Sequence, residues 1–369
     1  MRLVLVGAGH AHLHLLNQAG ALRIAGLDVT LVAPAAFHYS GLASGVLSGA
    51  LPPAAARIDV AALAAAHQVK HRQTTVEGVN RSARTVRLAE GDDLPFDLVS
   101  FNVGSTVEDP MGLVGALDVW PVKPLSRLFD LQARLEAMLR CEGPAPRVVV
   151  AGGGQTGFEI AAAIAGLCAR HGRQADVTIV SRSSPHWGPA EALASLRRHL
   201  ETRGIGILAG EVVAREAGRC GLTDGRSLPC DVLVLAGGLV APPLISGLGL
   251  PTDEAGRLRV TPALHAPYDP AVFAAGDCAV IDSAPRPPAG VFGVRAAPVL
   301  AANLMARAQG AALRAYEPQR RWLSIMDLGD GNGLALRGRL WWRGRAALWL
   351  KRRLDLGFVA AARGLRPGA

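Results

Sequence analysis

The most constraining feature of the sequence is a series of elements that occurs twice. The pattern predicts a buried strand, a glycine turn and a helix from VLVGAGHAH (4–12), and the same from VVVAGGGQTG (148–157), about 145 residues later. After each copy come a second strand, a hairpin and another buried strand that ends in glycine. Chance would have to produce the whole series twice, so the repeat predicts an α/β fold with two Rossmann-like dinucleotide-binding domains.

The second glycine turn has the complete fingerprint of a dinucleotide site. Its first glycine permits the tight turn, its second lets the backbone approach a pyrophosphate, and its third lets the helix lie close to the strand. The start of the helix adds N–H groups that favour an anion. A packing turn without ligand is the alternative. The predicted site residues are Gly152, Gly154, Gln155, Thr156 and Gly157, with Gly237 at the end of the matching strand.

The tip of the following strand bears on the choice of nucleotide. An NAD site usually carries an acid there, but this chain has Ser181 and Arg182. An arginine at that position can hold a 2′-phosphate, which indicates NADPH or loose NAD(P)H selectivity. The alternative is that Arg182 is a solvated loop residue.

The first glycine turn departs from the fingerprint. His12 stands where the third glycine is expected, so the helix must lie farther from the strand or the imidazole must find a niche. A metal site of His10, His12 and His14 is the alternative. Zinc needs three or four convergent ligands, and no cysteine or carboxylate cluster accompanies these histidines. We therefore predict no metal.

The charge of the chain is concentrated at its C-terminal end. Residues 330–369 hold nine basic and two acidic residues, and so carry +7 of the net +9. Apolar residues recur at helical spacing over 339–362 (Ala347, Leu350, Leu354, Phe358 and Ala361), accompanied by Trp341, Trp342 and Trp349. A basic amphipathic helix with tryptophan favours an anionic membrane surface. The alternatives are packing on its own domain or on a partner in a homodimer; nucleic acid is disfavoured because no binding module accompanies the charge.

Apolar runs and cysteines bear on the compartment. No apolar run has the roughly 18 residues of a membrane-spanning helix, and Gly7, Gly9 and the histidines interrupt the apolar N-terminal stretch. The cysteines form no C-x-x-C pair, which suits a reducing compartment. We expect a cytoplasmic protein, peripheral on the cytoplasmic face of the membrane if the tail binds lipid. The five cysteines are Cys141, Cys168, Cys220, Cys230 and Cys278.

These motifs together resemble the pyridine nucleotide-disulfide oxidoreductase superfamily, the flavoproteins with two dinucleotide-binding domains. The resemblance covers residues 1–310 and rests on GAGHAH (7–12), GGGQTGFE (152–159), FDLVSFNVGS (96–105), CDVLVLAGG (230–238) and FAAGDCA (273–279). Further segments are similar to a subgroup near the type II NADH dehydrogenases, which includes the flavoprotein domain fused to selenide, water dikinase. They are HYSGLASGVLSG (38–49), VKPLSRL (122–128), AGVFGVRAAPVLAANL (289–304) and WLKRRLDLGF (349–358).

The resemblance implies FAD at the first turn and NAD(P)H, as co-substrate, at the second. Asp277 would meet the ribityl–phosphate region of FAD, and Glu159 would lie near the contact between nicotinamide and flavin. Tyr39 and His38 lie in a loop expected to approach the flavin, and with Glu159 they are the candidate catalytic residues. The residues implied for FAD are Gly7, Gly9, His10, Ala11, His12, Gly104, Gly276 and Asp277.

The domain organisation implied is an FAD-binding domain split around an NAD(P)H-binding domain. We expect the first FAD part at 1–118, the NAD(P)H domain at 119–242, the second FAD part at 243–328 and the basic amphipathic region, a pair of interface helices, at 329–369. No cysteine lies within 34–52, where disulfide reductases carry their redox pair, which argues against thiol–disulfide exchange. The positions of Cys141 and Cys168 argue likewise against sulfide:quinone reduction.

The expected function is an FAD-dependent NAD(P)H oxidoreductase that passes electrons to a quinone or another small acceptor. One alternative is a soluble electron-transfer flavoprotein with a protein partner, with a link to selenium metabolism by analogy alone. Another is a flavin-bound redox sensor or scaffold with little turnover.

Overall fold

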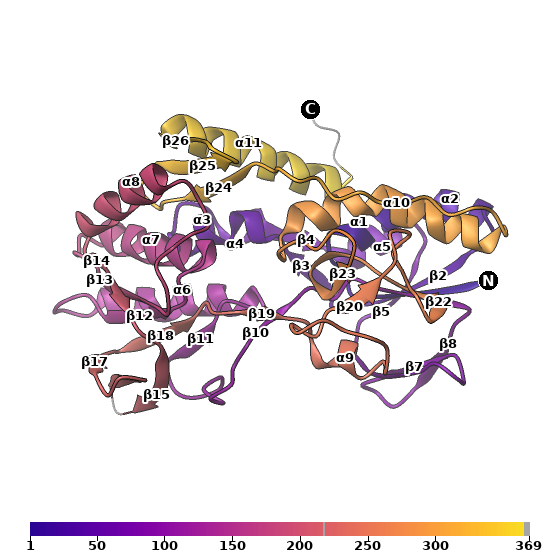
Figure 1. The fold of residues 1–369 in the computed structure, drawn as a ribbon, viewed down its shortest axis with the longest axis horizontal. Helices are drawn as coiled ribbons and strands as arrows, with labels where there is room; N and C mark the ends of the chain where they lie inside the picture. Colours follow the sequence, from indigo (N-terminus) through magenta and orange to yellow (C-terminus); the bar gives the residue numbers. More distant parts are fainter. Residues whose placement is uncertain (217, 365–369) are drawn as a thin grey trace.

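The first domain is built on a parallel sheet that crosses the right half of Figure 1. The computed structural model describes residues 1–216 and 218–364. Five strands of the sheet run parallel, and β21 joins its edge antiparallel. The strand order is β21 (His265–Ala266), β22 (Asp269–Ala274), β9 (Leu98–Phe101), β1 (Arg2–Val6), β2 (Asp28–Val32) and β5 (Lys70–Arg72).

Helices cover one face of this sheet, and a β-hairpin layer lies on the other (Figure 1). Helix α1 makes its most extensive contacts with α10, not with its own strand. The covering helices are α1 (His10–Asn17), α2 (Ala19–Ile24) and α10 (Gly290–Ala308); on the other face lie β6 (Val76–Asn80), β7 (Thr85–Leu88), β8 (Asp93–Pro95) and α9 (Pro243–Ser246). Shorter elements complete the domain: β3 (Ala36–His38), η1 (Ser40–Leu42), α3 (Ala43–Leu47), α4 (Pro53–Ala56), β4 (Arg57–Asp59), α5 (Val60–Ala66), β20 (Leu258–Val260), η2 (Gly276–Cys278) and β23 (Ala279–Ile281).

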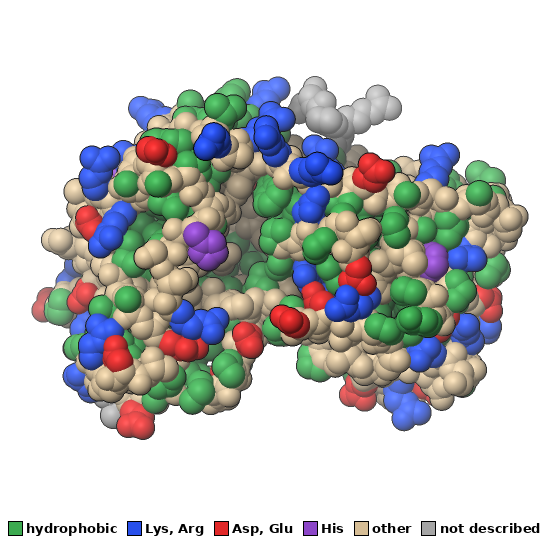
Figure 2. Space-filling model, in the orientation of Figure 1, with side chains coloured by type: hydrophobic (Ala, Val, Ile, Leu, Met, Phe, Trp, Pro, Cys, Tyr) green, Lys and Arg blue, Asp and Glu red, His purple; other side chains and the backbone are tan. Residues whose placement is uncertain are grey.

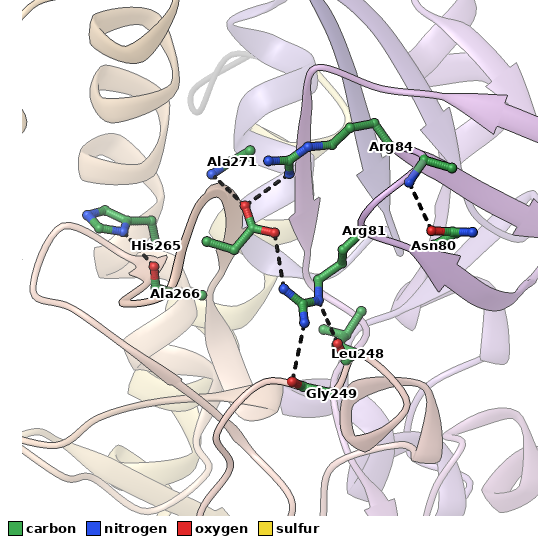
Figure 3. A network of polar contacts seen from close by, with 10 residues as sticks. Asn80, Arg81, Arg84, Leu248, Gly249, His265, Ala266 and Ala271 are labelled. Carbon is green, nitrogen blue, oxygen red and sulfur yellow. Dashed lines mark hydrogen bonds and ion pairs between the residues drawn. The ribbon is translucent and has the colours of Figure 1, made fainter.

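The first domain is assembled from two stretches of chain that are far apart in sequence. Strand β22 pairs in parallel with β9, so residues after the second domain complete a sheet begun before it. Figure 3 shows a network of polar contacts between the two stretches. The Arg81 guanidinium donates to the carbonyl of Leu248 at 2.7 Å, and Arg84 donates to the buried carboxylate of Asp269 at 2.9 Å.

The second domain repeats the arrangement with a five-stranded, all-parallel sheet. Its order is β11 (Val119–Pro121), β18 (Val232–Leu235), β12 (Arg147–Ala151), β13 (Asp176–Ser181) and β14 (Ile205–Ala209). The accompanying elements are α6 (Ser126–Arg140), α7 (Gln155–Arg170), α8 (Ala190–Glu201), and a small sheet of β15 (Val212–Glu216), β16 (Arg219–Leu222) and β17 (Ser227–Pro229). A short antiparallel pair of strands, β10 (Thr106–Val107) and β19 (Leu239–Val240), connects the domains. The predicted α/β class with two Rossmann-like domains is confirmed.

The C-terminal region differs from the prediction of a helix over 339–362 and of a pair of interface helices. An antiparallel sheet comes first, and one helix follows it: β24 (Ser324–Asp327), β25 (Gly333–Arg337), β26 (Leu340–Gly344) and α11 (Arg345–Ala362). Trp341 and Trp342 pair with Leu336 and Ala335 of β25, because bulky aromatic side chains fit a pleated ladder. Residues 365–369, including Arg366, are part of the predicted 329–369 region and lie outside the described residues.

Helix α11 lies across the top of both domains in Figure 1. Its inward face carries Ala347, Leu348, Asp355 and Val359, whereas Leu354 of the predicted apolar stripe is exposed. The buried face therefore overlaps the predicted stripe only in part, since Ala347 is buried and Phe358 is half-buried against the core, whereas Leu354 and Ala361 are exposed. Within residues 1–216 and 218–364, no helix is both long and apolar enough to cross a bilayer.

Candidate functional site

The first glycine turn is closed by a side chain from a neighbouring strand. Gly7 adopts φ +84°, and the N–H of Gly9 donates to the Asn102 carbonyl at 3.1 Å. The Asn102 side-chain oxygen accepts from the N–H groups of Ala11 and His12, at 2.9 and 3.2 Å, and its amide donates to the Ala275 carbonyl at 2.6 Å. Asn102 thus caps α1 and ties together the ends of β9 and β22.

Of the two alternatives for His12, the structure shows the second: the imidazole lies in a niche of its own between β1 and β9. The imidazole is fully buried, with Nδ1 2.6 Å from the Gly7 carbonyl and Nε2 2.9 Å from the Ser100 hydroxyl. A neutral ring protonated on Nδ1 satisfies both partners, donating to Gly7 and accepting from Ser100. Burial lowers the pKa of His12 to about 4, so the ring stays neutral at physiological pH. His12 is a structural part of the turn.

Asp277 lies at the carboxyl end of β22 in a cluster of polar side chains. Lys123 Nζ is 2.8 Å from the Asp277 carboxylate and 2.6 Å from the Ser105 hydroxyl, which itself donates to Asp277 at 3.0 Å. Burial opposes ionisation, but the Lys123 charge and these hydrogen bonds hold the pKa of Asp277 below its usual value. The family resemblance implies a role for Asp277, but no motif assigns one to Lys123 or Ser105.

His10 and Tyr39 meet beside this cluster, whereas His38 turns away. The His10 ring contacts Phe37, Tyr39 and Phe358, and burial lowers its pKa to about 4. The His38 ring lies instead against Phe129 of α6, with ring centroids 4.9 Å apart. The two residues predicted together thus point to different surroundings.

The second glycine turn opens into a cavity of about 750 Å³. Gly152, Gly154, Gln155, Thr156 and Gly237 line it, and a Cβ on Gly154 would meet no atom within 4 Å. A Cβ on Gly157 would overlap the Gly152 carbonyl oxygen, so this glycine is required for the close approach of α7 to β12. The volume is that of a small-molecule or cofactor site.

Arg182 lies at the rim of this cavity with an acidic neighbour. Its guanidinium is 3.6 Å from the carboxylate of Glu211, which follows β14, and both side chains are exposed. Trp187 closes the same rim by donating from its indole N–H to the Gly153 carbonyl at 3.0 Å. Neither Glu211 nor Trp187 belongs to a sequence motif that would have predicted a place at this cavity.

Glu159 lies in a partly buried polar network that joins both domains to α11. Its Oε1 accepts from the Ser44 hydroxyl at 2.7 Å and from the Asp327 N–H at 2.9 Å. Lys351 of α11 lies 4.0 Å from Glu159 but only 3.0 Å from Asp355, and Asp355 accepts from the Tyr39 hydroxyl at 2.9 Å. Burial raises the pKa of Glu159, and it also raises the pKa of nearby Asp327.

The two turns suit dinucleotides. Gly104 has φ +73°, and a Cβ built on Gly104 or on Gly154 would point into open space. Glycine at such positions leaves room for a ligand to approach the backbone closely. Within residues 1–216 and 218–364, no group of three His, Cys, Asp or Glu side chains could hold a metal ion. In a flavoprotein of this build, Asp277 and the first turn would hold FAD, and the second cavity would take NAD(P)H.

The chain is similar to several known reductases and oxidoreductases. The chain is 30% identical over 295 residues to a probable ferredoxin reductase of Castellaniella defragrans, covering 75% of this chain and 67% of the relative. It is 26% identical to a demethylphylloquinone reductase of Synechocystis, over 56% of this chain and 53% of the relative. The sulfide:quinone oxidoreductase of Aquifex aeolicus has the same fold, with a TM-score of 0.80 at 16% identity over 98% of this chain and 91% of that one.

The family profile described as "Pyridine nucleotide-disulphide oxidoreductase" matches residues 1–310, which include both glycine turns and Asp277. FAD and NAD(P)H are the cofactor and co-substrate of this family. The chain belongs to the pyridine nucleotide-disulphide oxidoreductase family and is an FAD-dependent NAD(P)H oxidoreductase.

Proposed function

We propose that this enzyme transfers electrons from NAD(P)H to a quinone at the surface of an anionic membrane. The reaction consumes NAD(P)H, one proton and a quinone, and yields NAD(P)⁺ and a quinol. Bound FAD supplies the hydride acceptor and the electron relay. The protein has to hold the nucleotide at the second turn, hold FAD at the first, and supply a proton.

The observation that carries the proposal is the network from Glu159 to α11. Quinone reduction needs protons, and burial raises the pKa of the Glu159 carboxyl, which favours its protonated form. The hydrogen bonds that Ser44 and Asp327 donate to Glu159 both fall on Oε1, so a proton on Oε2 would leave them intact. Lys351 and Asp355 connect this carboxyl to the helix that bears the exposed surface.

The names of two similar proteins support a quinone acceptor. One relative is a demethylphylloquinone reductase, and one protein of the same fold is a sulfide:quinone oxidoreductase. The ferredoxin reductase relative supports the competing acceptor, an iron–sulfur protein. Tyr39 is proposed as a second polar group near the flavin, with its hydroxyl held by Asp355.

A matched pair of variants tests the acceptor and Glu159 together. With short-chain ubiquinone, Glu159→Gln is expected to lower kcat about 100-fold, because general acid–base catalysis typically contributes 10²–10⁴. Anaerobic reduction of the FAD by NAD(P)H should remain, and Glu201→Gln, on the exposed surface of α8, should behave as wild type. The proposal is wrong if a [2Fe–2S] ferredoxin is reduced and ubiquinone is not. Failure of both nicotinamides to bleach the flavin absorbance would favour a sensor or scaffold.

The membrane part of the proposal rests on the outer face of the C-terminal region. Trp349 and Leu356 are exposed on α11, Leu340 and Trp342 on β26, and Arg343, Arg345 and Arg353 lie among them. Blue side chains crowd this upper edge in Figure 2. Each cation near anionic lipid contributes about 1 kcal/mol, and tryptophan favours the interface.

Point variants are the appropriate membrane test, because truncation would remove Lys351 and expose the Glu159 network. Trp349→Ser combined with Arg353→Glu should lower flotation with phosphatidylglycerol vesicles several-fold, whereas Arg87→Glu, at an exposed position of β7, should not. Equal flotation of all three proteins would contradict a lipid-binding α11.

A further inference from the structure

The first dinucleotide turn offers an anion fewer backbone donors than its fold suggests. The N–H groups of Ala11 and His12 at the start of α1 already donate to Asn102. A pyrophosphate at this turn therefore needs compensation from elsewhere. It must also tolerate the largely buried carboxylate of Asp277, since a second anion close by is repelled strongly at low dielectric.

Lys123 is the cation that faces this carboxylate. The side chains of Lys123 and Asp277 are only 20% and 15% exposed, and their charged atoms are 2.8 Å apart. Lys123 comes from the segment after β11, at the start of the second domain, whereas Asp277 and Ser105 follow strands of the first domain. The pair therefore joins the two domains at the point where FAD is expected.

We propose that Lys123 is an FAD-positioning residue: it neutralises Asp277 and, with Ser105, fixes the carboxylate that meets the ribityl–phosphate region of FAD. The inference rests on FAD binding at the first turn, and it is independent of which acceptor the enzyme uses. Lys123 thereby lets a carboxylate and a phosphate share one buried site. Removing only one partner leaves the other charge largely buried and unpaired, so we expect a single substitution to weaken FAD retention more than the removal of both partners.

The proposal makes FAD retention depend on pH in a particular way. The titratable groups that face Asp277 are Lys123, His10 at the start of α1, and the buried thiol of Cys278, whose pKa burial raises to about 12. In the wild type, Asp277 stays ionised and paired between pH 5.5 and 8. Without Lys123, the carboxylate repels phosphate while it is ionised, and burial favours its protonation as the pH falls.

The rate of FAD release from purified holoprotein, followed by flavin fluorescence, tests this. Lys123→Met should release FAD about 100-fold faster than wild type at pH 8, and distinctly less so at pH 5.5. Adding Asp277→Asn to Lys123→Met should restore retention at pH 8 to within about tenfold. Lys123→Arg should retain FAD better than Lys123→Met, and Lys70→Met, which removes an exposed lysine paired with Asp28, should match wild type.

Two results would overturn the inference. One is a Lys123→Met release rate equal to that of wild type. The other is an acceleration that is the same at both pH values and unaffected by Asp277→Asn, because that pattern means Lys123 only supports the fold. A wild-type protein that carries no FAD at all would instead contradict FAD binding at the first turn.

Discussion

The two glycine turns share the same backbone hydrogen bond, but protein side chains fill the space inside the first turn, whereas the second turn faces an open cavity. In each, the N–H of the first glycine donates to the strand beyond, Gly7 to Val32 and Gly152 to Val180, both at 2.9 Å. The first turn then fills its inner space with protein. The His12 imidazole bonds to the Gly7 carbonyl and the Ser100 hydroxyl, and the Asn102 side-chain oxygen accepts from the N–H groups at the start of α1. The second stays open to its cavity, and no side chain of the described residues caps α7.

Strand register explains why these residues come as a set. Leu5 of β1 pairs with Ser100, and the equivalent Val150 of β12 pairs with Val234. By the same register Asn102 corresponds to Ala236. The first copy therefore has a histidine, a hydroxyl and an amide where the second has Gly157, a valine and an alanine. The difference suits a turn built permanently around one cofactor and another left free for a co-substrate that exchanges.

The largest effect is expected from moving the histidine into the second turn. In Gly157→His the Cβ overlaps the Gly152 carbonyl, and Val234 offers no hydroxyl to the ring. Reduction of the FAD by NAD(P)H should fall by up to about 100-fold while the FAD remains bound, because overpacking of about 1–3 kcal/mol and a displaced helix both act on the second site. Stopped-flow reduction and flavin content measure the two effects. Normal reduction would show that the close approach of α7 to β12 is not needed.

Removing the histidine from the first turn should have the next largest effect. His12→Gly leaves the Gly7 carbonyl and the Ser100 hydroxyl buried without a partner, at a cost of about 2–4 kcal/mol in the free energy of unfolding. Adding Ser100→Val should recover part of that loss. The control His14→Gly, on a half-buried position of the same helix, should cost about 1 kcal/mol. Unfolding in urea and flavin content report the outcome, and unchanged values for His12→Gly would reduce the imidazole to a space filler.

The dependence of stability on pH sharpens the same contrast. The pKa of His12 is about 4 in the fold and about 6.5 unfolded, so the unfolded chain takes up the proton first as the pH falls. The stabilisation is complete above pH 6.5 and is lost progressively toward pH 4, by about 3 kcal/mol in all. His12→Gln should remove this part of the slope when unfolding free energies at pH 7 and pH 5 are compared. An identical slope in both proteins would mean that His12 titrates normally.

Comparing the two turns also shows how far the sequence could lead. The repeated strands, turns and helices predict both sheets, because hydrophobic runs and glycines act locally. The niche around His12 depends on Ser100, which lies opposite it only through strand register, although aligning the two copies would have flagged Ser100 and Asn102 as polar departures. Lys123 could not have been assigned, since it meets Asp277 only after the two domains have packed. Lys351 pairs with Asp355 at a helical spacing that the sequence shows, but its approach to Glu159 depends on how α11 packs. The prediction of a helix over 339–362 was wrong for 340–344, which form strand β26, because apolar residues at these positions are compatible with a helix and with a strand.

The smallest effect is expected at the strand tips, where the two domains also differ. The first strand ends at Ala33–Pro34, which has no charge, whereas the second ends at Ser181 and Arg182, whose guanidinium faces Glu211. An exposed pair of this kind contributes about 1 kcal/mol or less, so a 2′-phosphate can compete for Arg182.

Arg182→Glu should lower kcat/KM for NADPH about tenfold or more and leave kcat/KM for NADH nearly unchanged. Glu211→Gln should raise kcat/KM for NADPH several-fold, because it frees the arginine. Glu216→Gln, at the exposed end of β15, serves as the control. If the NADPH/NADH ratio is the same in all four proteins, Arg182 is a solvated loop residue, and the cavity selects its nucleotide by contacts other than charge at this strand tip.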